Sequence, residues 1–322
     1  MNTLTFSLRR RLVKDYNLPI HLHEDPYFPY LMDLYNLYWD TNKKAGMMNE
    51  VLAKKGGREE DFFKTAEEVV ANMSATITHS QAMKQLTDMD AAEFEKRFPV
   101  MFKLPTPNIY HDDFLGKALV SVDLKNANFN VIRLLGLGEE LNAHSYEDWM
   151  KEVTPFPYFQ QAKGLRQVVF GHLQPKRQQR LQKYVMGVLA APIIKEGGII
   201  LSSSSDELII EGLNADKVQS LISGAALARD IPQNFWRTEC FILQKIIPDQ
   251  SFYLRASVDL EGKAKQDFKM VPSFMMPQVY KAFIKQEVQE EDLVFLHEGK
   301  LSRFLTPSFV INKKINIAKP SF

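Results

Sequence analysis

The sequence predicts an α+β fold, in which a helical N-terminal region is followed by an antiparallel sheet with helices on one face. Two observations support this prediction. Apolar residues recur every three or four positions over residues 26–104, and short runs rich in β-branched residues replace that pattern after Pro105 and Pro107. We therefore expect three regions, namely a helical region (1–105), a sheet domain (106–243) and a C-terminal α/β segment (244–322).

The N-terminal region has helical periodicity in residues 31–40, 60–86 and 90–98, where Glu and Lys separate the apolar positions. Gly56 and Gly57 interrupt the pattern and predict a loop before a helix that begins near Glu60. The sequence LPTPNIYHDD (104–113) then ends the helical pattern, because a proline disfavours helix at the residue before it. This stretch predicts a linker or domain boundary.

The first strand of the sheet domain is predicted at ALVSVDL (118–124), an apolar run with β-branched residues. The next segment, NFNVIRLLG (128–136), has helical or extended character. SYEDWMKEV (145–153) predicts a short helix with Ser145 as its N-cap. PKRQQRLQKYVMGVLAAPI (175–193) predicts a strongly basic helix, because Pro175 stands where prolines favour a helix start.

A hairpin is predicted over residues 197–213, where the β-like runs IILSS and ELIIEGL flank a polar centre at Ser204, Ser205 and Asp206. Later segments alternate between the two types of structure. We expect helices at 215–228 and 276–286, and strands at 235–247 and 252–262.

The charge balance limits the classes of function. Lys and Arg number 40 and Asp and Glu 39, a formal net charge of +1, so any binding of nucleic acid must depend on a local basic patch. The single cysteine, Cys240, excludes an intrachain disulfide framework and a Cys-rich zinc site. A reducing compartment is the simpler inference. With no stretch of about 18 apolar residues, we expect an intracellular protein without a membrane partner.

Three segments carry residues suited to phosphate chemistry. Asp123 ends the first strand, and Asp206 and Glu207 lie at the turn or start of the hairpin. Carboxylates at the ends of neighbouring strands repel one another, and a divalent cation, Mg²⁺ or Mn²⁺, relieves that repulsion. On the predicted basic helix, Lys176, Arg180 and Lys183 share one face. A cationic face of this kind is suited to a triphosphate.

These segments resemble the palm domain of template-using polymerases and related nucleotidyltransferases. DLKNANFNVIR (123–133) resembles the first palm motif of family B DNA polymerases, and SSSDELI (203–209) resembles the third. The SDE triplet is also similar to that of tRNA-His guanylyltransferase-like palm enzymes. PKRQQRLQKYVMG (175–187) resembles, more loosely, the fingers helix that holds the incoming triphosphate.

The resemblance implies a palm-like catalytic domain (106–243) with a basic fingers helix, followed by a thumb-like C-terminal segment. It implies that Asp123 and Asp206 are catalytic metal ligands, with Glu207 beside them as a further candidate metal ligand. The substrate-binding residues that it implies are Asn128, Phe129, Arg133, Lys176, Arg177, Arg180 and Lys183. Three positions depart from the family pattern: Asn128 occupies the usual aromatic sugar position, Ser204 replaces a frequent acid, and Tyr184 and Gly187 are separated.

The function expected from these features is metal-dependent nucleotidyl transfer onto DNA or RNA, with a nucleoside triphosphate as the second substrate. Asn128 under the sugar favours ribonucleotides, with Phe129 packed in the core; the alternative register places Phe129 under the sugar. A different class of function is also compatible with the sequence. Asp123 can be a cap or turn residue and the basic helix a solvated face, in a non-catalytic palm-like module that binds nucleic acid or a protein.

Overall fold

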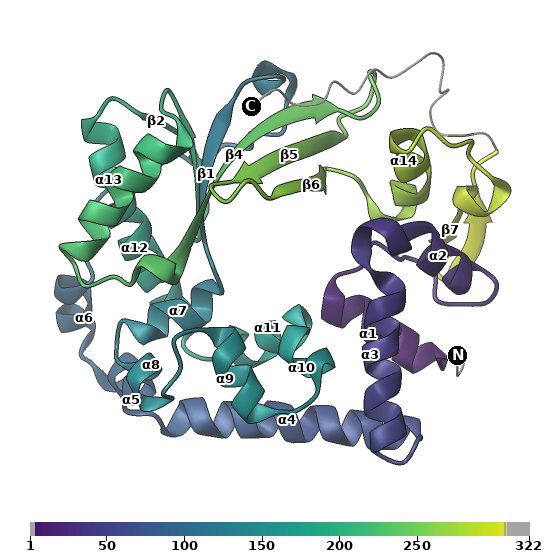
Figure 1. The fold of residues 1–322 in the computed structure, drawn as a ribbon, viewed down its shortest axis with the longest axis horizontal. Helices are drawn as coiled ribbons and strands as arrows, with labels where there is room; N and C mark the ends of the chain where they lie inside the picture. Colours follow the sequence, from purple (N-terminus) through teal and green to yellow (C-terminus); the bar gives the residue numbers. More distant parts are fainter. Residues whose placement is uncertain (1–3, 306, 308–322) are drawn as a thin grey trace.

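Helices make up the first part of the chain in the computed structural model, which describes residues 4–305 and 307 (Figure 1). They are α1 (Phe6–Tyr16), α2 (Tyr27–Trp39), α3 (Thr41–Lys54), α4 (Glu59–His79), α5 (Gln81–Asp88) and α6 (Ala91–Arg97). In α4, Phe62, Val69 and Met73 follow the predicted spacing and are buried. The loop at Gly56 and Gly57 is present, and both glycines have positive φ, which glycine adopts without strain. The predicted helical N-terminal region is confirmed.

A linker without regular helix or strand, apart from the short 3₁₀ turn η1 (Asp112–Phe114), joins these helices to the sheet. It is held along the hairpin, because the Ser203 amide donates to the Pro105 carbonyl at 2.7 Å and the Ser202 hydroxyl donates to the Pro107 carbonyl at 2.7 Å. Further along, Ile109 joins a small apolar cluster on the sheet. The predicted linker therefore also covers one face of the sheet.

The strands form an antiparallel sheet in the order β2-β3-β1-β4-β5-β6 within the described residues. Their bounds are β1 (Leu119–Leu124), β2 (Ile199–Ser203), β3 (Glu207–Glu211), β4 (Trp236–Lys245), β5 (Tyr253–Asp259) and β6 (Ala264–Lys269). The predicted hairpin is confirmed as β2 and β3. Strand β6 was not predicted, because AKQDFK carries almost no apolar pattern.

Seven helices lie between the strands in the described chain. They are α7 (Ala127–Arg133), α8 (Leu137–Glu140), α9 (Tyr146–Val153), α10 (Pro157–Gln161), α11 (Lys163–Gly171), α12 (Pro175–Lys195) and α13 (Ala215–Leu227). Val120 and Val122 of β1 pack into the main core with these helices, whereas Leu119 points to the linker side. The predicted starts are confirmed, since Pro175 opens α12 and the Ser145 hydroxyl accepts from the Asp148 amide of α9.

The first part of the C-terminal segment belongs to the sheet, and the remainder lies outside the sheet. The expected division between residues 243 and 244 falls inside β4, β5 pairs with β4, and β6 pairs with β5. Beyond the sheet lie α14 (Met276–Phe283), a small hairpin of β7 (Val294–His297) and β8 (Lys300–Arg303), and the 3₁₀ turns η3 (Ser273–Met275) and η4 (Glu290–Leu293); a further 3₁₀ turn, η2 (Gln233–Phe235), directly precedes β4. Residues 306 and 308–322 of the expected segment lie outside the described residues.

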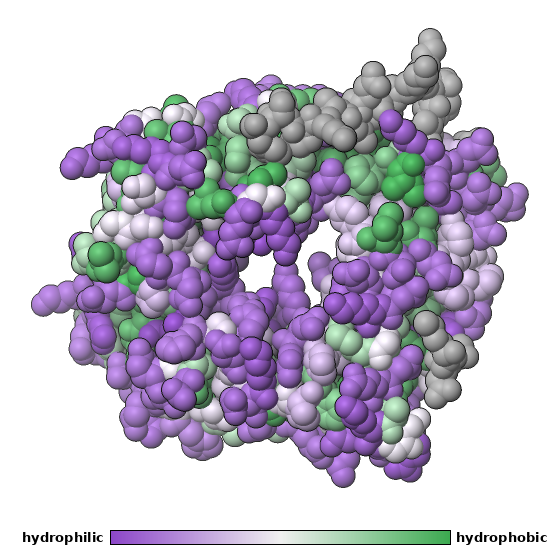
Figure 2. All heavy atoms as spheres, in the orientation of Figure 1, coloured by the Kyte–Doolittle hydropathy of each residue, from purple (hydrophilic) through white to green (hydrophobic). Residues whose placement is uncertain are grey.

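The two ends of the described chain pack against each other and close a ring. Tyr35 and Tyr38 of α2 make edge-to-face contacts with Tyr280 and Phe268 at centroid distances of 5.5 Å. Space-filling shows a hole through the ring with a largely hydrophilic rim (Figure 2). No helix among the described residues combines the length and apolar character that crossing a bilayer requires.

Candidate active site

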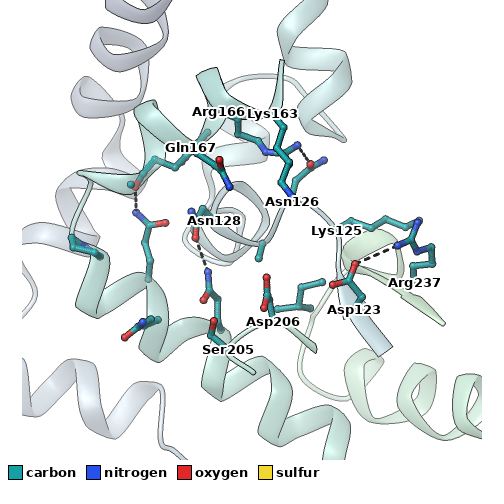
Figure 3. A pocket seen from close by; sticks show the side chains of 18 of the residues that line it. Asp123, Lys125, Asn126, Asn128, Lys163, Arg166, Gln167, Ser205, Asp206 and Arg237 are labelled. Carbon is teal, nitrogen blue, oxygen red and sulfur yellow. Dashed lines mark hydrogen bonds and ion pairs between the residues drawn. The ribbon is translucent and has the colours of Figure 1, made fainter. Parts of the chain in front are cut away.

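A polar pocket of about 860 Å³ lies where β1 ends, between the tip of the β2–β3 hairpin and helices α7, α11 and α12 (Figure 3). Its volume is within the range of about 300–1,000 Å³ typical of ligand sites. The charged side chains that line it are Asp123, Asp206, Glu147, Lys125, Lys163, Arg166 and Arg237. Amide side chains from α7, α11 and α12 line most of the remaining wall.

Strand pairing brings the two predicted catalytic acids to the same end of this pocket. Asp123 of β1 is the cross-strand partner of Glu207, and the Leu124 amide donates to the Asp206 carbonyl at 2.7 Å. Asp206 therefore lies at the hairpin tip beside the end of β1, and Figure 3 shows both carboxylates there. The Ser204 hydroxyl donates to Asp206 Oδ1 at 2.8 Å and orients that carboxylate.

The environment of Asp123 disfavours its charge. Burial, and then repulsion from Glu207, raise the pKa of Asp123 to about 6, although Arg237 acts in the opposite direction. Arg237 Nη2 lies 3.6 Å from Asp123 Oδ2 across the β1–β4 pair. A carboxylate that is half desolvated and repelled by its neighbours is suited to binding a cation.

Glu207, expected beside the metal ligands, is held away from the pocket. Its Oε1 accepts hydrogen bonds from Ser121 Oγ and from Arg255 Nη1, both at 2.7 Å. Burial opposes the charge of Glu207, but the buried Arg255 and these hydrogen bonds outweigh it and lower the pKa of the carboxyl. Arg255 also lies 3.8 Å from Glu239 Oε2. Glu207 thus belongs to an ion-pair network on the linker side of the sheet.

Of the two residues expected near the sugar, Asn128 and Phe129, only Asn128 lines the pocket. Asn128 lines it from α7, and its Oδ1 accepts from Gln182 Nε2 at 2.6 Å. Phe129 is fully buried and stacks on Trp149 at a centroid distance of 5.8 Å, as expected for the core position. Arg133, at the end of α7, donates to Asn130 Oδ1 at 3.0 Å and lies outside the pocket lining.

The basic helix α12 presents a different face to the pocket from the one expected. Gln178, Gln179 and Gln182 line the pocket, whereas Arg177 donates to the Leu86 and Met89 carbonyls at the end of α5 and Arg180 donates to the Phe98 carbonyl and Glu95.

Carbonyls at helix ends lack intrahelical partners and attract guanidinium groups, so these arginines fasten α5 and α6 to α12. Lys176 is exposed and outside the lining of the described pocket, and Lys183 lines a neighbouring cavity.

Two of the four cations that line the pocket in the described chain, Lys163 and Arg166, come from α11, which was not predicted to contribute to the site, and the others are Lys125 and Arg237. Lys163 and Arg166 lie three residues apart on this short helix and project toward the pocket (Figure 3). Burial lowers the pKa of the Arg166 guanidinium, which donates to Asn126 Oδ1 and lies 5.2 Å from the Tyr146 ring centroid. The available signal was this spacing on an amphipathic nine-residue helix.

The ligand chemistry of the pocket fits a magnesium-type ion. Within residues 4–305 and 307, no group of three or more His, Cys, Asp and Glu side chains is arranged to hold a metal. Mg²⁺ is commonly bound by one or two carboxylates together with substrate phosphates, so Asp123 and Asp206 are residues of this pocket that could serve as protein ligands. Neither a protein-family model nor a curated protein matches this chain.

Proposed function

We propose that this chain is a palm-like nucleotidyltransferase that adds nucleotides to a nucleic-acid strand. One observation carries the proposal: Asp123 and Asp206, from neighbouring strands, line the same pocket as Lys163 and Arg166. Acids and cations in one pocket supply the two parts of a nucleoside triphosphate reaction, in which a reacting centre needs metal ligands and a polyphosphate needs positive charge. The charges are mixed rather than separated, since Arg237 pairs with Asp123 and Glu147 lies near Arg166.

The pocket residues divide into roles by charge and position. Asp123 and Asp206 would hold Mg²⁺ or Mn²⁺, and a bound divalent cation would activate the attacking hydroxyl and neutralise charge on the leaving pyrophosphate. Lys163 and Arg166 would bind the β- and γ-phosphates. Asn128, fixed by Gln182, would contact the sugar. The strand's 3′-hydroxyl attacks the α-phosphorus and loses its proton to water, a new P–O bond forms, and the bond to pyrophosphate breaks with its electron pair leaving on the pyrophosphate oxygen.

The surrounding architecture supports the same proposal. The sheet around β1 and β3 corresponds to the palm-like part, α11 and α12 to the fingers, and α14 with its neighbouring hairpin to the thumb-like segment. The space-filling view shows a central hole with a largely hydrophilic rim, as expected of a surface that contacts nucleic acid (Figure 2). In this proposal α12 contributes amides to the substrate and its arginines support the fold.

The test is incubation of the purified chain with end-labelled DNA and RNA oligonucleotides, with and without a complementary template, and each nucleoside triphosphate in Mg²⁺ or Mn²⁺. Extension products, lost in the Asp123→Asn variant, would support the proposal. Binding of oligonucleotides without extension under every condition would favour the non-catalytic module instead.

A further inference from the structure

A second cavity, of about 650 Å³, adjoins the candidate active site around the tip of the β2–β3 hairpin. The two cavities share Gln179 of α12 and Ser205 of the tip as lining residues. Asp206 lines the first cavity and directly follows Ser205. A ligand in the second cavity therefore lies next to the proposed reacting centre.

One wall of this cavity is an extended apolar segment that stays open to solvent. Val100, Met101 and Phe102 are 46%, 39% and 38% exposed, although they are consecutive and near the start of the linker. The linker beyond them is held by the hydrogen bond between the Ser203 amide and the Pro105 carbonyl. A partly exposed aromatic ring beside an open cavity is a stacking surface, and every nucleobase has a face that can stack on it.

Helix α12 and the hairpin tip supply positive charge and hydroxyl groups to the lining. Lys183 of α12 lines the cavity and is exposed, and Ser204 and Ser205 border it at the hairpin tip. No acidic side chain is among its lining residues in the described chain. Lys103, next to Phe102, is a second lysine in the lining. Aromatic, apolar and ammonium groups around a cavity of this size suit a nucleotide, with its base on the ring and its phosphate near a lysine.

We infer that this second cavity is the acceptor site, which holds the 3′-terminal nucleotide of the strand being extended. Its base stacks on Phe102, its phosphate contacts Lys183, and its 3′-hydroxyl points past Ser205 toward Asp206. The inference rests on the proposed function and adds the place of the second substrate. It also reassigns Lys183 from the triphosphate to the acceptor strand.

The test measures strand binding separately from nucleotide binding in the full chain. The probe is a 5′-fluorescein oligonucleotide of about 12 nucleotides, long enough to span a typical single-strand site. Phe102→Ala should weaken its binding roughly 10-fold, as loss of one base-stacking contact does. Phe102→Trp should bind the oligonucleotide as tightly as the parent, because it keeps an aromatic ring at this position. The KM for the strand should rise in Phe102→Ala while the KM for the triphosphate stays unchanged.

Matched controls exist on the same chain. Phe274 is 39% exposed and lies away from both cavities, so Phe274→Ala should leave binding unchanged. Lys176 is an exposed lysine of α12 outside both linings, so Lys183→Gln, but not Lys176→Gln, should reduce the salt dependence of binding by about 0.7 in slope. A 2-aminopurine base should report stacking when placed at the 3′ end and lose that signal in Phe102→Ala.

The outcomes separate this inference from the proposed function. If the parent extends strands but Phe102→Ala and Lys183→Gln bind them normally, the acceptor site lies elsewhere and the proposed transfer still stands. If these variants raise the KM for the triphosphate alone, the cavity binds that substrate and the inference is wrong. If the parent neither binds nor extends any oligonucleotide, both proposals fail.

Discussion

Asp123 and Arg237 are cross-strand partners on β1 and β4, and their charged groups lie 3.6 Å apart at the edge of the candidate active site. Arg237 Nε also lies 2.7 Å from Glu239 Oε1, so one guanidinium serves two carboxylates. The ion pair therefore compensates Asp123 only in part. This explains why burial and the repulsion from Glu207 still raise the pKa of Asp123.

The first prediction concerns pH and stability. Because the pKa of Asp123 is raised to about 6, the folded state binds this proton more tightly than the unfolded state, and stability falls as pH rises through the interval from about 4 to 6. Asparagine does not ionise. Asp123→Asn should therefore match the parent near pH 4 and be more stable above pH 6.5, by ~1 kcal/mol, because solvent screens this partly exposed group.

Urea unfolding at several pH values measures this difference. In an Arg237→Gln background the gain from Asp123→Asn should increase, because the carboxylate loses its nearest cation. A gain that is independent of pH would show that Asp123 is not the titrating group.

The second prediction concerns the two acids in the pocket. Asp123→Asn and Asp206→Asn should each reduce transfer by at least about 1,000-fold, since two-metal chemistry depends on both ligands. Asp113→Asn, at a carboxylate that is 85% exposed outside the pocket, should retain parental activity. Circular dichroism and urea midpoints establish folding. Full activity in either pocket variant rules out this site.

The third prediction separates the cations by position. Lys163→Gln and Arg166→Gln should each raise the KM for the triphosphate roughly 10-fold through loss of a charged contact. Arg177→Gln should leave that KM unchanged and destabilise the fold by about 1–3 kcal/mol, because two carbonyls lose their donor. Steady-state kinetics and urea unfolding of the same preparations decide between the two effects. If Arg177→Gln raised the KM for the triphosphate and the two α11 variants did not, the triphosphate would bind to α12 instead.

The fourth prediction concerns the sugar. Asn128 lines the pocket, and its amide can hydrogen-bond the 2′-hydroxyl of a ribose, so the parent should incorporate ATP. Asn128→Tyr should lose ATP but keep dATP, because the larger ring leaves no space for that hydroxyl. Phe129→Ala should instead destabilise the fold by about 3–5 kcal/mol, because it empties a fully buried site. The measurement is the rate of incorporation of ATP and of dATP by the parent and by each variant, which gives the preference between ribose and deoxyribose. A parent that rejects ATP contradicts the role of Asn128.

Local sequence patterns were enough to predict most elements of the fold. The proline at the start of α12, the Ser145 cap of α9 and the serine-rich turn between β2 and β3 each act through neighbouring backbone groups, so their signals are short-range. The sequence also determined that Asp123 ends a strand and Asp206 occupies a hairpin tip. Strand β6 carried no such signal. It forms because its backbone pairs with β5, which is a contact between segments and not a local pattern.

Only the tertiary structure decided which residues share the pocket. Arg177 and Arg180 have the charge expected of phosphate ligands, but the packing of α5 and α6 against α12 presents them with backbone carbonyls. The rotation of α12 then places glutamines toward the pocket, and α11 brings Lys163 and Arg166. Glu207 neighbours Asp206 in sequence but points to Arg255, because adjacent residues at a strand start face different surroundings. Sequence determined the chemical groups available, whereas packing between distant segments decided their partners.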